Sequence, residues 1–291
     1  MFVVMGACGH VGSEVVKALL KEGQGVIGVT HDPGHVESLT GLGAQAALAD
    51  VNDPAALRAV FRKGRRAFLL NPPAAVDGDT DQVERHTVAC ILEALRDSGL
   101  EKVVAESTGG ARPGERLGDL NVLWELEEGL RHQSIPAAIN RAGFYMSNWD
   151  SQLDGLRESG QLVSLFPAGL RLPMAAPRDL GDIAARRLLS SLDDVGVQDV
   201  EGPARYSADD VAAAFAAALQ RDVRVTVTPR AQWVASFRAL GFSQPAAESY
   251  ARMTGASLDE LDLSDAPVRG RITIDDYVRE LAEGRQRTAR R

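Results

Sequence analysis

Apolar positions in the first half of the chain alternate between short continuous runs and helical spacing. Residues 2–5 (FVVM) form a continuous apolar run, which is typical of a strand buried on both faces. Similar runs follow at 25–33, 44–51, 65–73, 102–108 and 136–149, and helical stretches separate them at 11–20, 35–42, 54–63, 79–98 and 122–132. Because parallel neighbours need crossover connections, this alternation predicts an α/β fold with a doubly wound parallel sheet.

The regular alternation ends near residue 150. The next segment is rich in proline (FPAGLRLPMAAPRDLGD), and a helix is expected at 181–192. Ser207, followed by two aspartates, predicts the start of another helix. We therefore expect a larger domain over 1–150, with 178–192 packing back on it, and a smaller lobe over 151–291.

The composition is that of an ordinary globular protein, with 45% hydrophobic and 25% charged residues. The net charge of −8 argues against a general nucleic-acid binder, since clustered Lys and Arg bind backbone phosphates. The one basic cluster, RQRTARR at 285–291, is expected to be a frayed, solvated tail, with a binding arm as the alternative. Two cysteines suggest no disulfide framework, and no stretch is apolar enough to span a membrane. We expect a soluble, cytoplasmic protein.

Three glycines stand at equal intervals directly after the first strand, in GACGHVG: Gly6, Gly9 and Gly12. A helix N-terminus attracts phosphate through free N–H groups, provided that no side chain blocks the approach, and glycine removes that block. Between a buried strand and an amphipathic helix, this spacing predicts a phosphate-binding turn for a dinucleotide. The alternative is an ordinary tight turn.

Further motifs occur at the ends of the other predicted strands: GVTHDP, ADVNDPAAL, LLNPPA, VVAESTGGA and INRAGFYMSNW. Together with GACGHVG they resemble the atypical short-chain dehydrogenase/reductases, in particular the NmrA-like proteins and their NAD(P)H:quinone oxidoreductase relatives. The last motif resembles the family signature Arg-x-Gly-aromatic-x-x-x-Asn, here at Arg141, Gly143, Phe144 and Asn148. Beyond residue 150 the likeness is limited to length and layout. The resemblance implies a Rossmann-type sheet with a smaller, mostly C-terminal substrate lobe.

The resemblance also implies which residues contact an NAD(P) cofactor. On the glycine turn these are Gly6, Cys8, Gly9, His10, Val11 and Gly12. At the strand ends, Asp50 and Val51 would flank the adenine, Asn71 and Pro72 would lie along the cofactor, and Ser107 and Thr108 would border the nicotinamide. For each strand-end residue the alternative is a polar group that caps a turn.

The end of the second strand bears on the choice between NAD and NADP. NADP-dependent relatives usually carry an arginine there, which pairs with the 2′-phosphate, and His31 occupies this position. No Lys or Arg occurs from Glu22 through Leu57, and Asp32 would repel a phosphate. NAD is therefore favoured, with NADP as the alternative if Arg58 or Arg62 reaches the site.

The proton-donating Tyr-x-x-x-Lys pair of most short-chain reductases is missing, because GDLNVLWELEEGLRHQ (118–133) contains neither residue. Quinone reduction needs less help, since its hydroquinone anion is stabilised and solvent can protonate it. Tyr145, His132 and Ser107 are the candidate catalytic residues, and a structural role is the alternative for each. Trp124, Phe144, Tyr145 and Trp149 are candidate substrate contacts that could stack on a flat ring, with packing between the lobes as the alternative.

These features favour an NAD(P)-dependent oxidoreductase acting on a quinone or another flat aromatic substrate. The alanine- and arginine-rich composition hints at a GC-rich bacterium, and similar proteins occur in aromatic polyketide pathways. A tailoring role by reduction or by nicotinamide-assisted hydroxylation, as a monooxygenase, is therefore one hypothesis. The alternative class is a non-catalytic redox sensor of the NmrA type, which binds a partner. The few His and Cys residues show no metal spacing, and we expect a monomer or homodimer.

Overall fold

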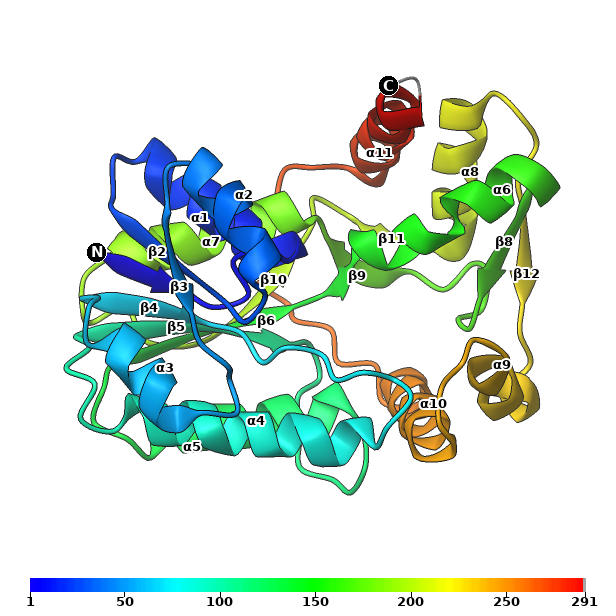
Figure 1. Ribbon diagram of the computed structural model, residues 1–291. Coiled ribbons are helices and arrows are strands. Elements are labelled where there is room, and N and C mark those ends of the chain that lie inside the picture. The colour runs from blue at the N-terminus through cyan, green and yellow to red at the C-terminus, as the bar shows by residue number, and fades with distance from the viewer. Residues whose placement is uncertain (290–291) are drawn as a thin grey trace.

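An eight-stranded parallel sheet forms the centre of the larger part of the molecule (Figure 1). The structure is a computed structural model and describes residues 1–289. The strand order is β13-β10-β6-β5-β4-β1-β2-β3. The bounds are β1 Phe2–Val4, β2 Val26–Thr30, β3 Gln45–Leu48, β4 Arg66–Leu69, β5 Lys102–Thr108, β6 Ala137–Ala142, β10 Gly196–Glu201 and β13 Val268–Arg269. The order reverses direction between β1 and β4, which is the doubly wound, Rossmann-type arrangement expected from the sequence.

Helices cover both faces of this sheet (Figure 1). One face carries α1 (His10–Lys21), α2 (Val36–Gly41) and α7 (Pro177–Leu189), and the other carries α3 (Pro54–Phe61), α4 (Thr80–Leu95) and α5 (Asp119–Arg131). Alternate residues of a strand point to opposite faces, so Val3 packs with the α3–α5 layer and Val4 with the α1–α7 layer. Both faces are apolar, which explains the continuous hydrophobic runs in the sequence.

The smaller lobe is built from short strands and helices. Its strands are β7 Phe144–Tyr145, β8 Gln161–Ser164, β9 Leu172–Ala175, β11 Arg205–Tyr206 and β12 Arg224–Val227, and its helices are α6 Leu153–Ser159, α8 Ala208–Leu219, α9 Trp233–Ala239, α10 Gln244–Asp259 and α11 Ile274–Ala289. Short 3-10 turns lie at η1 Pro33–His35, η2 Met146–Gln152 and η3 Arg230–Gln232. Ser207 caps α8 through a reciprocal bond pattern with Asp210, as the sequence predicted. The lobe has its own apolar core around Trp149 and Phe215.

Segments from the second half of the chain return to the large sheet. Helix α7 packs against α1. The sequence pattern did not predict β10 or β13, which extend the sheet beyond β6. The division at residue 150 stays a prediction, and the chain crosses between the two parts more than once. Of the basic stretch 285–291, Arg290 and Arg291 lie outside the described residues.

The described residues show neither a membrane span nor a metal site. No helix there combines the length and the apolar character needed to cross a bilayer. No group of three or more His, Cys, Asp or Glu side chains in that part of the chain is placed to hold a metal ion.

Candidate functional site

The glycine turn joins β1 to α1 at the point where the strand order reverses. Gly6 adopts a left-handed φ of 61°, and the N–H of Gly9 donates to the Gly6 carbonyl over 2.9 Å. A Cβ on Gly12 would lie 2.1 Å from that carbonyl oxygen, so only glycine fits there. The turn and the helix therefore pack backbone against backbone.

The first amides of α1 have no side-chain cap, whereas Asp53 caps α3 and Asp79 caps α4. His10 is exposed at the start of α1, and Val11 is buried in the core beneath it. A helix start without a cap, reached over glycine, fits a pyrophosphate group well. This cradle is the structural observation that fits a dinucleotide at the predicted place.

The end of β2 lies beside the glycine turn. Asp32 Oδ1 accepts a hydrogen bond from the N–H of Gly34 over 2.8 Å, and its Oδ2 lies 3.8 Å from His35 Nε2. His35 Nδ1 is 3.3 Å from the hydroxyl of Thr30. His31 is exposed and has no side-chain hydrogen bond within the described residues. The Asp32 carboxylate is thus used in the turn that starts η1.

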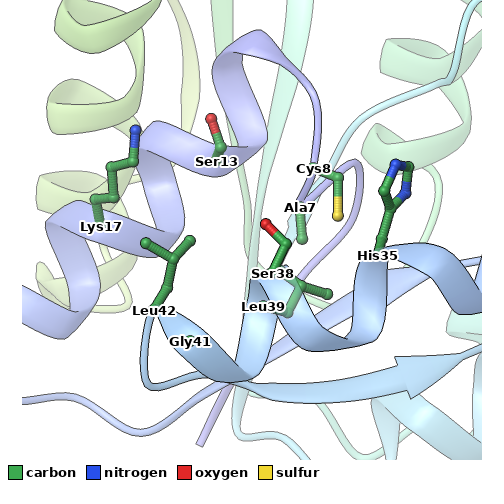
Figure 2. Close-up of a pocket in the computed structure, with 9 residues that line it drawn as sticks. All are labelled: Ala7, Cys8, Ser13, Lys17, His35, Ser38, Leu39, Gly41 and Leu42. Atoms are coloured by element: carbon green, nitrogen blue, oxygen red, sulfur yellow. The ribbon is translucent and has the colours of Figure 1, made fainter. Parts of the chain in front are cut away.

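A pocket of about 470 Å³ opens between α1 and α2, next to the glycine turn (Figure 2). Lys17 and Ser13 project from α1 and Ser38 from α2, while Cys8 and His35 lie at one end. The remaining lining residues are Ala7, Leu39, Gly41 and Leu42. Lys17, Ser13 and Ser38 were not among the predicted site residues, because their positions within helices carry no motif that marks a site.

The two arginines expected to be able to reach this region are bound elsewhere. Arg58 donates to the Glu93 carbonyl and carboxylate over 2.5 and 2.7 Å, and Arg62 donates to the Asp97 carbonyl over 3.1 Å. Both contacts join α3 to the end of α4, on the face of the sheet opposite α2. Neither arginine lines the pocket.

At the ends of β3 and β4 the polar side chains cap local turns, which is the alternative given above for the strand-end residues. Asp50 Oδ1 accepts from the backbone and side-chain nitrogens of Asn52 over 2.9 and 3.0 Å. Asn71 Oδ1 accepts from Thr87 over 2.5 Å, while its Nδ2 donates to the Glu84 carbonyl. The side chains of Asp50 and Asn71 are therefore engaged in local turns. The neighbouring Val51 and Pro72 are half-buried.

Ser107, at the end of β5, is bound within the protein. The residue is 2% exposed, and its hydroxyl donates to Glu127 Oε1 over 2.6 Å. Arg141 of β6 holds the same carboxylate through two bonds of 2.8 Å, and Arg131 adds a third of 3.0 Å. The Glu127 bonds raise the pKa of Arg141. The proposed catalytic role of Ser107 is therefore not supported, because its hydroxyl joins β5, α5 and β6. Thr108 is half-buried beside it.

His132 lies far from the glycine turn. It ends α5, which starts at the carboxyl edge of the sheet and runs back for 13 residues, about 20 Å at the usual rise. Its ring is exposed, and Nδ1 lies 2.7 Å from the Glu128 carbonyl. His132 therefore sits near the edge of the sheet where the strands begin, and its role as a proton donor stays a prediction that this position does not favour.

Tyr145 of β7 is surrounded by carboxyl groups. Burial raises its pKa well above the usual range, and the charges of Glu106 and Asp119 add to this. Glu106 of β5 is 3% exposed, and neither carboxyl oxygen has a hydrogen-bond partner of ordinary length among the described residues. Burial raises the pKa of Glu106, while the facing amide of Asn140 opposes this. The Tyr145 phenol is thus held neutral, the opposite of the effect of a lysine.

Glu106 was not among the predicted site residues. The signal for it was a carboxylate directly after the apolar residues of VVAEST, which a strand buried on both faces tolerates only at a cost.

The four predicted aromatic contacts do not share one environment. Trp149 is 4% exposed in the core of the smaller lobe, edge-to-face with Phe144 at 5.8 Å between ring centroids. Phe144 also packs against Phe166 at 5.5 Å. Trp124 and Tyr145 are half-buried. The structure corrects the prediction for Trp149, because a buried ring has no free face to stack on a substrate.

The model of the NmrA-like family matches residues 1–256. The chain belongs to the NmrA-like family. The match runs far past residue 150. The likeness therefore extends beyond the first half of the chain, to which the motifs had limited it. The resemblance to atypical short-chain reductases is confirmed.

Similar proteins include enzymes from several bacteria. An NAD(P)H azoreductase of Xenophilus azovorans is 24% identical over 249 residues, which cover 86% of this chain and 84% of that protein. The NADPH-dependent quinone oxidoreductase of Escherichia coli, solved with NADPH, is 19% identical with a TM-score of 0.78, covering 97% of this chain and 99% of that one. The triphenylmethane reductase of Citrobacter sp., solved with NADP(H), is 17% identical with a TM-score of 0.80, covering 97% and 100%. The two structures share the fold over almost the whole chain.

Proposed function

We propose that the protein is an NAD(P)H-dependent oxidoreductase whose acceptor is a quinone or another flat, electron-poor aromatic compound. The observation that carries this proposal is the cradle of Gly6, Gly9 and Gly12 at the uncapped start of α1. The relatives support it, since they are an azoreductase, a quinone oxidoreductase and a triphenylmethane reductase that use NAD(P)H.

The residues of the chain would bind and orient the cofactor and the acceptor, and they would not exchange protons with the acceptor. The backbone of the glycine turn would hold the pyrophosphate, and Thr108 with the glycines after it would border the nicotinamide end. When bound, the cofactor supplies a hydride. The protein's part is to hold the acceptor in line and to exclude water.

The proposed acceptor class follows from the lack of a free proton donor among the residues described at the end of β5. Ser107 is bound to Glu127, and His132 lies at the far edge of the sheet. Burial raises the pKa of the Tyr145 phenol, and the carboxyl groups of Glu106 and Asp119 add to this, so the phenol donates a hydrogen bond more readily than a proton. A quinone suits such a site, because its reduced anion is stabilised and takes its proton from water.

A finer hypothesis places this chemistry in the tailoring of aromatic polyketides. A hydroquinone is electron-rich enough to react with oxygen without a metal, which would allow nicotinamide-assisted hydroxylation as well as reduction. Both reactions remain predictions, as do a cytoplasmic location and a monomeric or homodimeric state.

A non-catalytic redox sensor is the second candidate. One observation favours it: Trp149 and Phe144 pack in the core of the smaller lobe, which leaves fewer aromatic faces for a substrate. A sensor requires only the nucleotide cradle and a surface that responds to the bound redox state.

The deciding experiment mixes the purified protein with NADH or NADPH and a panel of quinones, with and without oxygen, and follows the absorbance of the reduced nicotinamide. We expect loss of this band only when a quinone is present. The Tyr145→Phe variant should retain turnover within about tenfold, since the phenol orients the acceptor but is not the proton source. If the protein binds the nucleotide tightly but turns over none of the acceptors, the proposal of an enzyme is wrong and the redox sensor takes its place.

A further inference from the structure

Helix α10 lies beside α4 and the loop that follows β5, at the carboxyl edge of the sheet (Figure 1). Arg252 Nε donates to the Arg116 carbonyl in that loop over 2.9 Å. Met253 packs on Gly118, the residue directly before α5. A helix from the second half of the chain is therefore fixed beside the start of α5, next to the strand ends where the nicotinamide end of a dinucleotide would lie.

Asp119 opens α5 directly after that contact. Its side chain has no hydrogen-bond or ion-pair partner within the described residues. Although the residue is exposed to solvent, the protein around it raises the pKa of its carboxyl group by desolvation. Burial raises the pKa values of Glu84, Tyr145 and Tyr250, and the charge of the unpaired carboxylate adds to each effect. Helices α4, α5 and α10 and strand β7 thus bring their side chains together around Asp119.

A second carboxyl group faces Tyr145 from within the sheet. Glu106 is 3% exposed, and both of its oxygens lack a hydrogen-bond partner of ordinary length among the described residues. Its charge acts on the Tyr145 phenol, as the charge of Asp119 does. Ser107 follows in β5 and points to the opposite face, so this group is separate from the Ser107–Glu127 contact. A buried carboxyl group without a partner is costly, and a bound cation would supply the partner.

Five side chains form what we call the acidic cluster: Glu84, Glu106, Asp119, Tyr145 and Tyr250. Among the described residues, no lysine or arginine charge shifts the pKa of any member. The rings of Phe237 and Phe242 hold Tyr250 from the side, with centroids 5.6 and 5.1 Å from its own. Carboxyl groups and aromatic faces without a cation of their own favour a ligand that is both aromatic and positively charged.

Resting on the proposed function, we propose that the acidic cluster selects an acceptor with a positive charge on a flat aromatic ring, and that Asp119 determines this specificity. The charge of such a ring would be attracted by the carboxylates, whereas a neutral quinone would build up negative charge beside them.

Hydride transfer to a cationic ring changes the charges in the direction that the cluster favours. The hydride carries one hydrogen nucleus and two electrons, so a C–H bond of the nicotinamide breaks and a C–H bond of the acceptor forms. The acceptor becomes neutral and the nicotinamide becomes cationic beside the carboxylates. No proton enters or leaves, so the reaction does not need a proton donor at the end of β5.

The test compares N-methylacridinium with acridine, two flat rings of the same shape, of which only the first is charged in mildly alkaline buffer. Ring fluorescence measures binding to the full chain, and the absorbance of the reduced nicotinamide measures turnover. We expect the wild type to bind the cation about tenfold more tightly than the neutral ring. Asp119→Asn should remove most of this preference and leave the affinity for acridine unchanged. The variant keeps the shape of a side chain that has no partner among the described residues, so it should fold as the wild type does.

Asp209→Asn is the matched control, because Asp209 is an exposed aspartate in the first turn of α8, in the smaller lobe. It should leave the preference unchanged. Equal affinity of the wild type for the two rings would overturn the inference, and so would equal losses from Asp119→Asn and Asp209→Asn.

The same measurements separate this inference from the proposed function. Turnover of naphthoquinone without any preference for the cationic ring would leave the proposed function standing and remove only the inference. A preference for the cation that Asp119→Asn abolishes, without turnover of the cation or of any quinone, would leave the cluster as a cation site and contradict the proposed enzyme.

Discussion

Two regions of the carboxyl edge of the sheet, which we call the β1–α1 end and the β5–α5–β6 end and which are separated by β4, differ in how their polar groups are used. At the β1–α1 end, glycines bring backbone against backbone, the first helix has no side-chain cap, and a pocket opens beside it. At the β5–α5–β6 end, Ser107, Glu127 and Arg141 bind one another and are largely closed to solvent. Both ends carry polar groups, yet the first leaves backbone amides without a side-chain cap for a ligand.

This difference shows that position at a strand end does not define a site residue. The hydroxyl of a residue that is 2% exposed, when it is bonded to a buried carboxylate, is part of the framework. The β1–α1 end is identified instead by glycines, which have no side chain, and by a helix start without a side-chain cap. A binding role at the β1–α1 end and a structural role at the β5–α5–β6 end can be tested separately.

The largest effect is expected from Gly12→Ala at the open end. The added Cβ would lie 2.1 Å from the Gly6 carbonyl oxygen, so the turn must open, at a cost above the roughly 3 kcal/mol that overpacking usually takes. Nucleotide binding, measured by calorimetry, should be lost together with stability, measured by urea unfolding. Gly155→Ala is the control, since a Cβ there meets nothing within 4 Å. A Gly12→Ala protein with normal stability and binding would show that the backbone contact is dispensable.

A smaller loss of stability is expected from Glu127→Gln at the closed end. The change removes the charge that faces Arg141, and breaking a buried pair in this way typically costs about 3 kcal/mol. Glu128→Gln on the same helix is the matched control, because Glu128 is 33% exposed and should change stability little. Urea unfolding measures both. If Glu127→Gln abolishes quinone turnover without loss of stability, the network belongs to the site after all.

The smallest effect concerns Glu84 of α4, which lies between the two ends. Burial raises its pKa to about 7, the charges of Asp119 and Asp81 add to this, and the bond from the N–H of Ala74 opposes it. The native state therefore keeps a proton that the unfolded chain releases at about pH 4.5, so the free energy of unfolding falls as the pH rises from about 4.5 to 7.

Glu84→Gln should flatten this pH dependence and stabilise the protein above pH 7, by an amount on the order of 2 kcal/mol. Urea unfolding at a series of pH values measures the effect. An unchanged slope in the variant would mean that another group titrates in this window. Asp77→Asn, at an exposed aspartate in the nearby loop, serves as the control for charge alone.

The sequence predicted the first six strands of the sheet and the glycine turn, because both depend on local patterns. A parallel strand buried on both faces appears as an apolar run, and a backbone contact at Gly12 requires glycine whatever lies elsewhere. Strand β10 (GVQDVE) was missed because its first half is exposed and polar, and β13 because it has only two residues.

The side-chain roles depended on partners that sequence spacing does not reveal. Ser107 was assigned to catalysis because its partner Glu127 lies 20 residues further along the chain. Lys17 was overlooked because the helix that faces it, α2, lies on the far side of a pocket that only the folded chain contains. Trp149 follows a family motif, but the direction of its ring is set by the core of the smaller lobe.

The pairing of β6 with β10 has a consequence for how the chain is made. Strand β6 ends at Ala142, and the strand that covers its outer edge begins only at Gly196, with β13 following at Val268. During synthesis the residues of the nucleotide cradle therefore leave the ribosome early. The outer edge of β6 then has no pairing strand until more than fifty further residues have been made. Unpaired edges invite association between chains. In a crowded polysome, this interval is when the nascent protein most needs protection by a chaperone.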